Sequence, residues 1–296
     1  MSYFTWIGSQ PEGSVAANVR RRIRSSSVLK ASLALATVLS LVSSGAVFAE
    51  PPMEGSAPEV SPPAPIWSIN IYDGSAVRYQ DPDWAACAAA AAQSMLNLVG
   101  VTTQADLPPR GGSLPRTTLH WQVDTSFAVE ESILAYERQN MTMYQSSPGT
   151  DAHGWRNALN YFGWGSMTAG VYVDTSFPSF DAAARQTVRS LAKTGKPVGI
   201  LGWFGGHAQY ITGYTVQGED PRISDNYTIL GVFMTDPLGS DQIRNVYTSM
   251  DTWRNGPLYV RFSPYYHNDS PYRDPIDGGT GNSQWWGKWV IINAVK

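Results

Sequence analysis

The sequence predicts an α+β fold, in which a helical first part packs against an antiparallel sheet formed by the later part. Up to Lys193, apolar residues recur mostly at helical spacing. From Gly195 onward they alternate with a period of two, among many β-branched and aromatic residues. Helices first and strands later argue against repeated βαβ units. Hydrophobic residues make up 43% of the 296-residue chain, which is enough for a real core.

The N-terminal segment has the pattern of an export signal. A basic cluster at Arg20–Arg24 is followed by an uncharged apolar run, Ala31–Phe48, which ends in small residues at Ala49. A buried core helix is the alternative reading. If uncleaved, the run is long enough to anchor the chain in a bilayer, with the arginines on the cytoplasmic side. We therefore expect residues 1–49 to be a signal peptide or membrane anchor, and the remainder to be secreted or extracytoplasmic.

A proline-rich stretch follows the apolar run. Residues 50–65 contain many prolines and no aromatic residue, which is typical of an extended linker. The folded domain is then expected to span residues 66–296.

The first predicted helix of the domain carries the only cysteine. Asp83 is a suitable cap for a helix from Trp84 to about Leu98, and Gly100 is a suitable stop. Cys87 would then lie in the first turn, where the positive end of the helix dipole stabilises a thiolate.

Further elements follow from the same periodicities. Helices are expected at 127–138, 151–162 and 179–193, the last ended by Gly195 and Pro197. Strands are expected at 198–203, 208–216, 227–235, 258–262 and 286–295.

A single cysteine in an exported chain cannot form an intramolecular disulfide. Cys87 is therefore a candidate nucleophile, and the alternative is a small buried residue in an alanine-rich helix. Among the four histidines, His207 is the best partner, because it follows two glycines at the turn between two apolar strands. Asp236 ends the next predicted strand and could orient the imidazole, although an Asp-Pro pair is also a common turn initiator.

The other features of the sequence argue against several classes of function. The net charge of −3 gives no strong positive potential that would attract nucleic acid. No phosphate-binding glycine motif joins a strand to a helix. No metal-binding spacing stands out, so no cofactor or metal is expected, and the segment Asp274–Asn282 is interpreted as a solvated loop rather than a calcium site. His153 is interpreted as a capping or surface group, and His120 and His267 as loop residues.

Three runs of sequence resemble the bacteriocin-processing peptidase-like (family thirty-nine-like) cysteine peptidases of the papain-like superfamily. The matching runs are 84–97 with the cysteine, 205–214 with Gly-Gly-His, and the Thr-Asp-Pro at 235–237. The stretch from Gly149 to Phe162 is also similar to a segment between cysteine and histidine in such domains.

This resemblance implies a papain-like fold, with helices carrying the cysteine packed on the sheet. It also implies a triad of Cys87, His207 and Asp236, which cleaves a peptide or amide bond through a thioester. The amide of Gln80 would join the Cys87 N–H in an oxyanion hole. Gln80 precedes Cys87 by seven positions where six is usual, and Ala88 and Ala89 replace the Gly or Pro often found there. A misplaced amide would cost about 3 kcal/mol of transition-state stabilisation.

Three functions follow from this pattern. The first is an exported thiol peptidase that acts on a peptide or protein substrate. The second keeps the same triad in an amidase or transpeptidase acting on cell-wall peptides. The third is a noncatalytic surface-binding domain on the same scaffold. In each case the only contact expected with a membrane is through an uncleaved N-terminal helix.

Overall fold

The computed structural model describes residues 63–80, 83–104, 124–142, 148–238, 243–256, 259, 261–263, 273–279 and 284–296. All of them belong to one compact unit, Ser61–Lys296. The expected signal segment 1–49 and most of the expected linker lie outside the described residues. In the part of the chain that is described, no helix is both long and apolar enough to cross a membrane.

The described unit is an α+β structure with five α-helices and a seven-stranded antiparallel sheet, as the sequence predicts. The strand order is β2-β7-β3-β4-β5-β6, and β1 pairs with β4. The strands are β1 (Ile66–Asn70), β2 (Tyr172–Phe177), β3 (Val198–Gly202), β4 (His207–Gly218), β5 (Tyr227–Thr235), β6 (Val246–Ser249) and β7 (Trp289–Ala294). The helices are α2 (Cys87–Gln104), α3 (Phe127–Gln139), α4 (Ala152–Trp164), α5 (Phe180–Thr194) and α6 (Met250–Asn255).

Strand β4 is the centre of the sheet. One of its edges pairs with β3 through residues 207–211 and then with β1 through residues 213–217. Its other edge pairs with β5, so that Tyr210 lies opposite Thr235. This register brings the first residues of β4 close to the chain that leaves β5.

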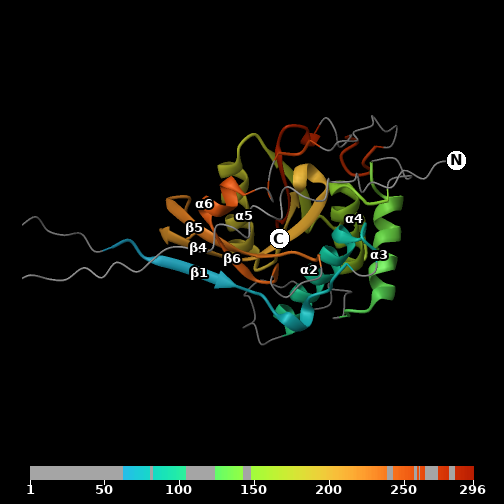
Figure 1. Cartoon of the computed structure of the whole chain (residues 1–296), viewed down its shortest axis with the longest axis horizontal. Coiled ribbons are helices and arrows are strands. Elements are labelled where there is room, and N and C mark those ends of the chain that lie inside the picture. The colour runs from blue at the N-terminus through green and yellow to red at the C-terminus, as the bar shows by residue number, and fades with distance from the viewer. Residues whose placement is uncertain are drawn as a thin grey trace, which may run out of the picture. The chain divides into compact units, whose positions relative to one another are not determined.

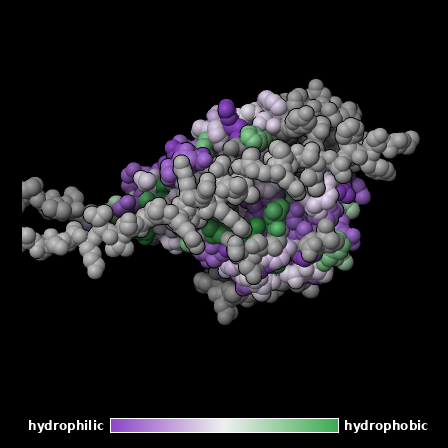
Figure 2. Space-filling model, viewed as in Figure 1, coloured by the Kyte–Doolittle hydropathy of each residue, from purple (hydrophilic) through white to green (hydrophobic). Residues whose placement is uncertain are grey.

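The helices form two layers on the sheet. Helices α2 and α4 bury their apolar residues against one face, together with Leu201, Tyr210 and Ile292. Helix α5 packs on the other face, against Ile200 and Ile291. Figure 1 shows α2, α3 and α4 grouped together, with β1 extending away from them. In the view of Figure 2, apolar residues reach the surface in separate areas among polar ones.

Several expected boundaries are wrong. Helix α2 begins at Cys87 instead of Trp84, because the side chain of Asp83 accepts from the Ala85 N–H and forms a turn there. It also continues through Gly100 to Gln104. The described residues of the expected strand 258–262 form no strand. Strands β1, β2 and β6 had no counterpart among the expected strands.

Candidate active site

Cys87 is the first residue of helix α2. The preceding turn is fixed by two hydrogen bonds to Asp83, one from the Ala85 N–H to its carboxylate (2.8 Å) and one from the Ala86 N–H to its carbonyl (3.1 Å). The N–H groups of a first helical turn have no carbonyl partner within their own helix, and the helix dipole is positive there. The half-buried Cys87 thiol therefore lies where a negative charge is stabilised.

His207 is the first residue of β4, directly after a strained turn. Trp203 and Phe204 in this turn have φ values of 46° and 61°, which residues with a side chain rarely adopt. Gly205 follows with a φ of 95°, and a Cβ there would lie only 2.4 Å from the Phe262 ring. The Trp203 ring stacks on the imidazole of His207, with centroids 4.5 Å apart. Strain of this kind persists where the surrounding structure holds it, and it is concentrated at functional sites.

The structure brings Cys87, His207 and Asp236 together. His207 Nε2 lies 2.8 Å from Asp236 Oδ1, and Cys87 is close enough to the His207 side chain to raise its pKa. Burial lowers the pKa of His207, but the hydrogen bond with Asp236, the neighbouring Cys87 and the charges of both outweigh it and raise the pKa to about 9.

Asp236 is itself held by three donors. Besides the imidazole, the Gln209 amide donates to Oδ2 (2.6 Å) and the Leu238 N–H donates to Oδ1 (2.9 Å). Burial raises the pKa of Asp236, yet the hydrogen bond and charge of His207 outweigh it and leave the pKa below its usual value. The carboxylate is therefore kept charged and oriented toward the imidazole.

Gln209 was not among the residues selected from the sequence. His207 and Gln209 are two positions apart on one strand, so their side chains point to the same face. The alternation of the strand could have indicated this residue once His207 was chosen. Its side chain is buried, and its role is to fix the second oxygen of Asp236.

Gln80 links the segment that follows Asp236 to the turn that precedes α2. Its backbone N–H donates to the Pro237 carbonyl, next to Asp236, and its amide donates to the Trp84 carbonyl at 2.9 Å. An amide nitrogen has two hydrogens, so one remains for another acceptor. The structure thus places Gln80 at the N-terminus of α2, while the expected oxyanion contact stays a prediction.

Glu137 is a buried carboxyl group close to Cys87. It lies in α3, on the same face as the buried residues Ile133 and Leu134. Neither of its carboxyl oxygens has a hydrogen-bond partner among the described residues. Burial, followed by the charge of Cys87, raises its pKa well above the usual value. Burial therefore favours the protonated form of Glu137, which would not oppose a thiolate at Cys87.

One minor expectation about a polar residue is wrong, and two are not addressed. His153 is not a capping or surface group, because its side chain is fully buried in the first turn of α4. In the segment that begins at Asp274, Asp274 itself is buried, whereas the next four residues are exposed, as expected of a solvated loop. His120 and His267 lie outside the described residues.

Comparison of the chain with protein-family models, with curated proteins and with solved structures found no match.

The pKa of His207 can be measured directly. We expect its imidazole to titrate near pH 9 in an NMR titration, above its ordinary value of 6.5. Stability from this raised pKa is fully present below about pH 6.5 and is lost as the pH rises through about 9. Asp236→Asn should lower the midpoint, whereas Asp225→Asn, which changes an exposed carboxylate, should not. A midpoint at the ordinary value in the unchanged protein would contradict the pairing.

Proposed function

We propose that the chain is an exported thiol hydrolase of the papain-like class, which cleaves peptide or amide bonds. The observation that carries this proposal is the grouping of Cys87 with the hydrogen-bonded pair of His207 and Asp236, contributed by the start of a helix and the ends of two neighbouring strands. The assignment to the papain-like class is supported by the arrangement of helices bearing the cysteine on an antiparallel sheet bearing the other two residues. Export is supported by the signal pattern of residues 1–49.

The reaction starts from a pair in which the proton of the Cys87 thiol has passed to the imidazole of His207, leaving a thiolate beside an imidazolium. The thiolate then attacks the carbonyl carbon of the substrate, and a C–S bond forms while the carbonyl oxygen becomes an oxyanion. His207 gives its proton to the leaving nitrogen, the C–N bond breaks, and a thioester remains on Cys87. Water, deprotonated by His207, attacks the thioester and releases the acid together with the regenerated thiol. Throughout the reaction, Asp236 orients the imidazole and stabilises its positive charge.

Two donors are proposed for the oxyanion. The first is the Cys87 N–H, at the start of α2, where the helix dipole adds to its effect. The second is the hydrogen of the Gln80 amide that is not donated to Trp84. Losing a donor of this kind costs about 3 kcal/mol of transition-state stabilisation, so the amide matters for rate even though the triad sets the chemistry.

Exposed apolar residues that lie close to the triad in the sequence suggest the kind of peptide that it receives. Trp203 and Phe204 are 43% and 55% exposed and precede His207 closely. Trp84, three positions before Cys87, is 55% exposed, and Leu238, two after Asp236, is 47% exposed. Exposed aromatic and aliphatic side chains next to polar reactive groups are typical of ligand sites. We infer that the substrate is a peptide segment with apolar side chains near the cleaved bond.

Thiol labelling tests the proposal, because Cys87 is the only cysteine. In the purified protein at pH 6, we expect iodoacetamide to alkylate Cys87 at least about 10-fold faster than in the same chain unfolded in denaturant. The reason is that the imidazolium of His207 stabilises the thiolate. His207→Ala should remove this advantage.

An exposed change far from the triad, Ile223→Ala, provides the control and should leave the labelling rate unchanged. Slow labelling that does not depend on His207 would eliminate the hydrolase and favour a noncatalytic binding domain. Fast labelling without hydrolysis of any tested peptide would instead favour a transpeptidase, in which an amine rather than water accepts the acyl group from Cys87.

A further inference from the structure

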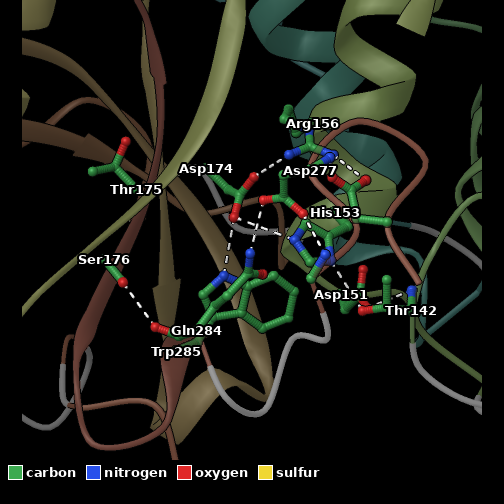
Figure 3. Close-up of polar contacts among 12 residues, drawn as sticks. Thr142, Asp151, His153, Arg156, Asp174, Thr175, Ser176, Asp277, Gln284 and Trp285 are labelled. Carbon is green, nitrogen blue, oxygen red and sulfur yellow. Dashed lines mark hydrogen bonds and ion pairs between the residues drawn. The ribbon is translucent and has the colours of Figure 1, made fainter. Parts of the chain in front are cut away.

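A second cluster of titratable side chains lies apart from the triad. His153 comes from the first turn of α4, and Asp174 from β2. Asp274 and Asp277 come from a turn near the C-terminus, and Arg156 lies one turn along α4 from His153. Figure 3 shows His153 between Asp174 and Asp277 on one side and Thr142 on the other. None of these groups takes part in the proposed hydrolysis.

The hydrogen bonds of Thr142 define which ring nitrogen of His153 is protonated. The Thr142 hydroxyl and N–H both donate to Asp151 Oδ2, each at 2.8 Å. Asp151 also caps α4 by accepting from the Gly154 N–H. A hydroxyl has one hydrogen, so the contact of 3.0 Å between Thr142 Oγ1 and His153 Nδ1 requires the imidazole to donate. Neutral His153 therefore carries its proton on Nδ1 and presents a lone pair at Nε2.

His153 Nε2 is buried and faces carboxylates without making a hydrogen bond. The side chain is 0% exposed, and Nε2 has no hydrogen-bond partner among the described residues. Its nearest recorded carboxylate oxygen, Asp174 Oδ2, is 3.6 Å away, which is too far for a hydrogen bond. A buried acceptor of this kind is costly unless something fills the position in front of it.

Two carboxylates lie close to the imidazole of His153. One ligand atom each from His153, Asp274 and Asp277 lie within 4.8 Å of one another. Ligands at about 2.0–2.2 Å from one metal ion are about 3–4 Å apart, so a small inward movement brings these three atoms into one coordination sphere. Asp277 is exposed, so its side chain is the least constrained by packing of the three.

The charges of the cluster leave a place for a divalent cation. Asp174 and Asp274 share the guanidinium of Arg156, which lies 2.5 Å from Asp174, and neither ion pair includes Asp277. These three carboxylates carry more negative charge than the Arg156 guanidinium offsets. Uncompensated charge next to buried carboxylates such as Asp274 is unfavourable, and a doubly charged ion offsets it.

We propose that His153, Asp274 and Asp277 bind a divalent first-row transition metal ion such as Zn²⁺. One imidazole nitrogen and two carboxylate oxygens suit Zn²⁺, Mn²⁺ or Co²⁺, whereas Ca²⁺ and Mg²⁺ prefer oxygen ligands alone. The hydrogen bond from Nδ1 to Thr142 is the kind of support that orients metal-binding histidines.

The surrounding residues already hold the proposed ligands in place. The turn is closed by the Asp277 N–H donating to Asp274 Oδ2 (3.0 Å), and the Gln284 amide donates to Asp277 Oδ2 (2.7 Å). The Trp285 ring lies 4.4 Å from the imidazole of His153, and its N–H donates to Asp174. The ion would join the C-terminal turn to α4, so its role is to stabilise the fold.

Metal titration of untagged protein tests this site. Cys87→Ser serves as the background, because a thiol beside an imidazole could itself bind zinc. After chelator treatment and dialysis, we expect calorimetry to show one Zn²⁺ bound per chain, and Co²⁺ to give a visible absorption spectrum. At a hundredfold excess of free metal over Kd, the Tm should rise by about 5 °C.

Two ligand variants and one control locate the ion. His153→Gln should abolish binding, and Asp277→Asn should weaken it by at least about 10-fold. Because Asp277 is exposed, its variant should fold even if His153→Gln does not. Asp225→Asn removes an exposed carboxylate elsewhere and should leave binding unchanged. No binding of Zn²⁺, Mn²⁺ or Co²⁺ at millimolar concentration, or binding that Asp277→Asn leaves intact, would overturn the proposal.

Discussion

Cys87→Ala is expected to lower kcat/KM for peptide cleavage by about 10⁴- to 10⁶-fold, which is the loss typical of removing a nucleophile that acts as a unit with its base. No other cysteine exists to replace it. The measurement is hydrolysis of a fluorogenic peptide chosen from a library with apolar residues around the cleaved bond. The Tm should change little, since the Cys87 side chain is only partly buried.

His207→Ala separates a true triad from a site where the thiol merely binds substrate. Residues that act as a unit are strongly non-additive, so the double variant should be about as inactive as either single variant. Changing Thr228, an exposed residue of β5, to Ala should keep full activity. Turnover that survives Cys87→Ala within a factor of ten would show that the cleavage belongs to other groups.

The elements that could be predicted from sequence are those with a strong internal period. Strands β3, β4 and β5 are buried along most of their length, and α5 has both its serine cap and its terminal glycine in place. These elements could therefore be predicted from residues that are close together in the sequence. The contact between His207 and Asp236 was predictable as well, because antiparallel neighbours bring the start of one strand to the end of the next.

The strands that the sequence analysis missed have few of the sequence features that are typical of strands. β2 and β6 are edge strands, and β2 contains Asp174, Thr175 and Ser176 in place of a continuous apolar run. β6 has only four residues. An edge strand pairs on one side only, so its sequence needs less β-branched and aromatic character. Its position is then decided by tertiary pairing.

The His153 cluster could not be predicted for a related reason. Its members come from α4, β2 and a turn more than a hundred residues further along the chain. No spacing in the sequence connects them, and tertiary contacts such as the pairing of β2 with β7 bring these segments together. Likewise, the burial of Glu137 beside Cys87 depends on how α3 packs on α2.

Trp155→Ala is expected to lower the free energy of unfolding by about 3–5 kcal/mol, the usual cost of truncating a buried tryptophan. Trp155 lies in α4, is fully buried, and belongs to the core between the helices and the sheet. For a domain of this size, the Tm should fall by about 10 °C. Chemical denaturation and calorimetry measure both quantities. Trp84→Ala, which removes a tryptophan that is 55% exposed, is the matched control and should cost less than about 1 kcal/mol.

The loss of unfolding free energy should be large because the residues opposite Trp155 cannot move into the cavity that the substitution creates. Its ring sits directly over Gly199 in β3, where an added Cβ would lie 2.5 Å from the indole. A glycine has no side chain that could move into the space, and the backbone of β3 is held by β4 and β7 on both sides. Unfilled volume therefore remains, and its cost adds to the lost burial. A loss below about 1 kcal/mol would mean that α4 is not docked on β3 by this residue.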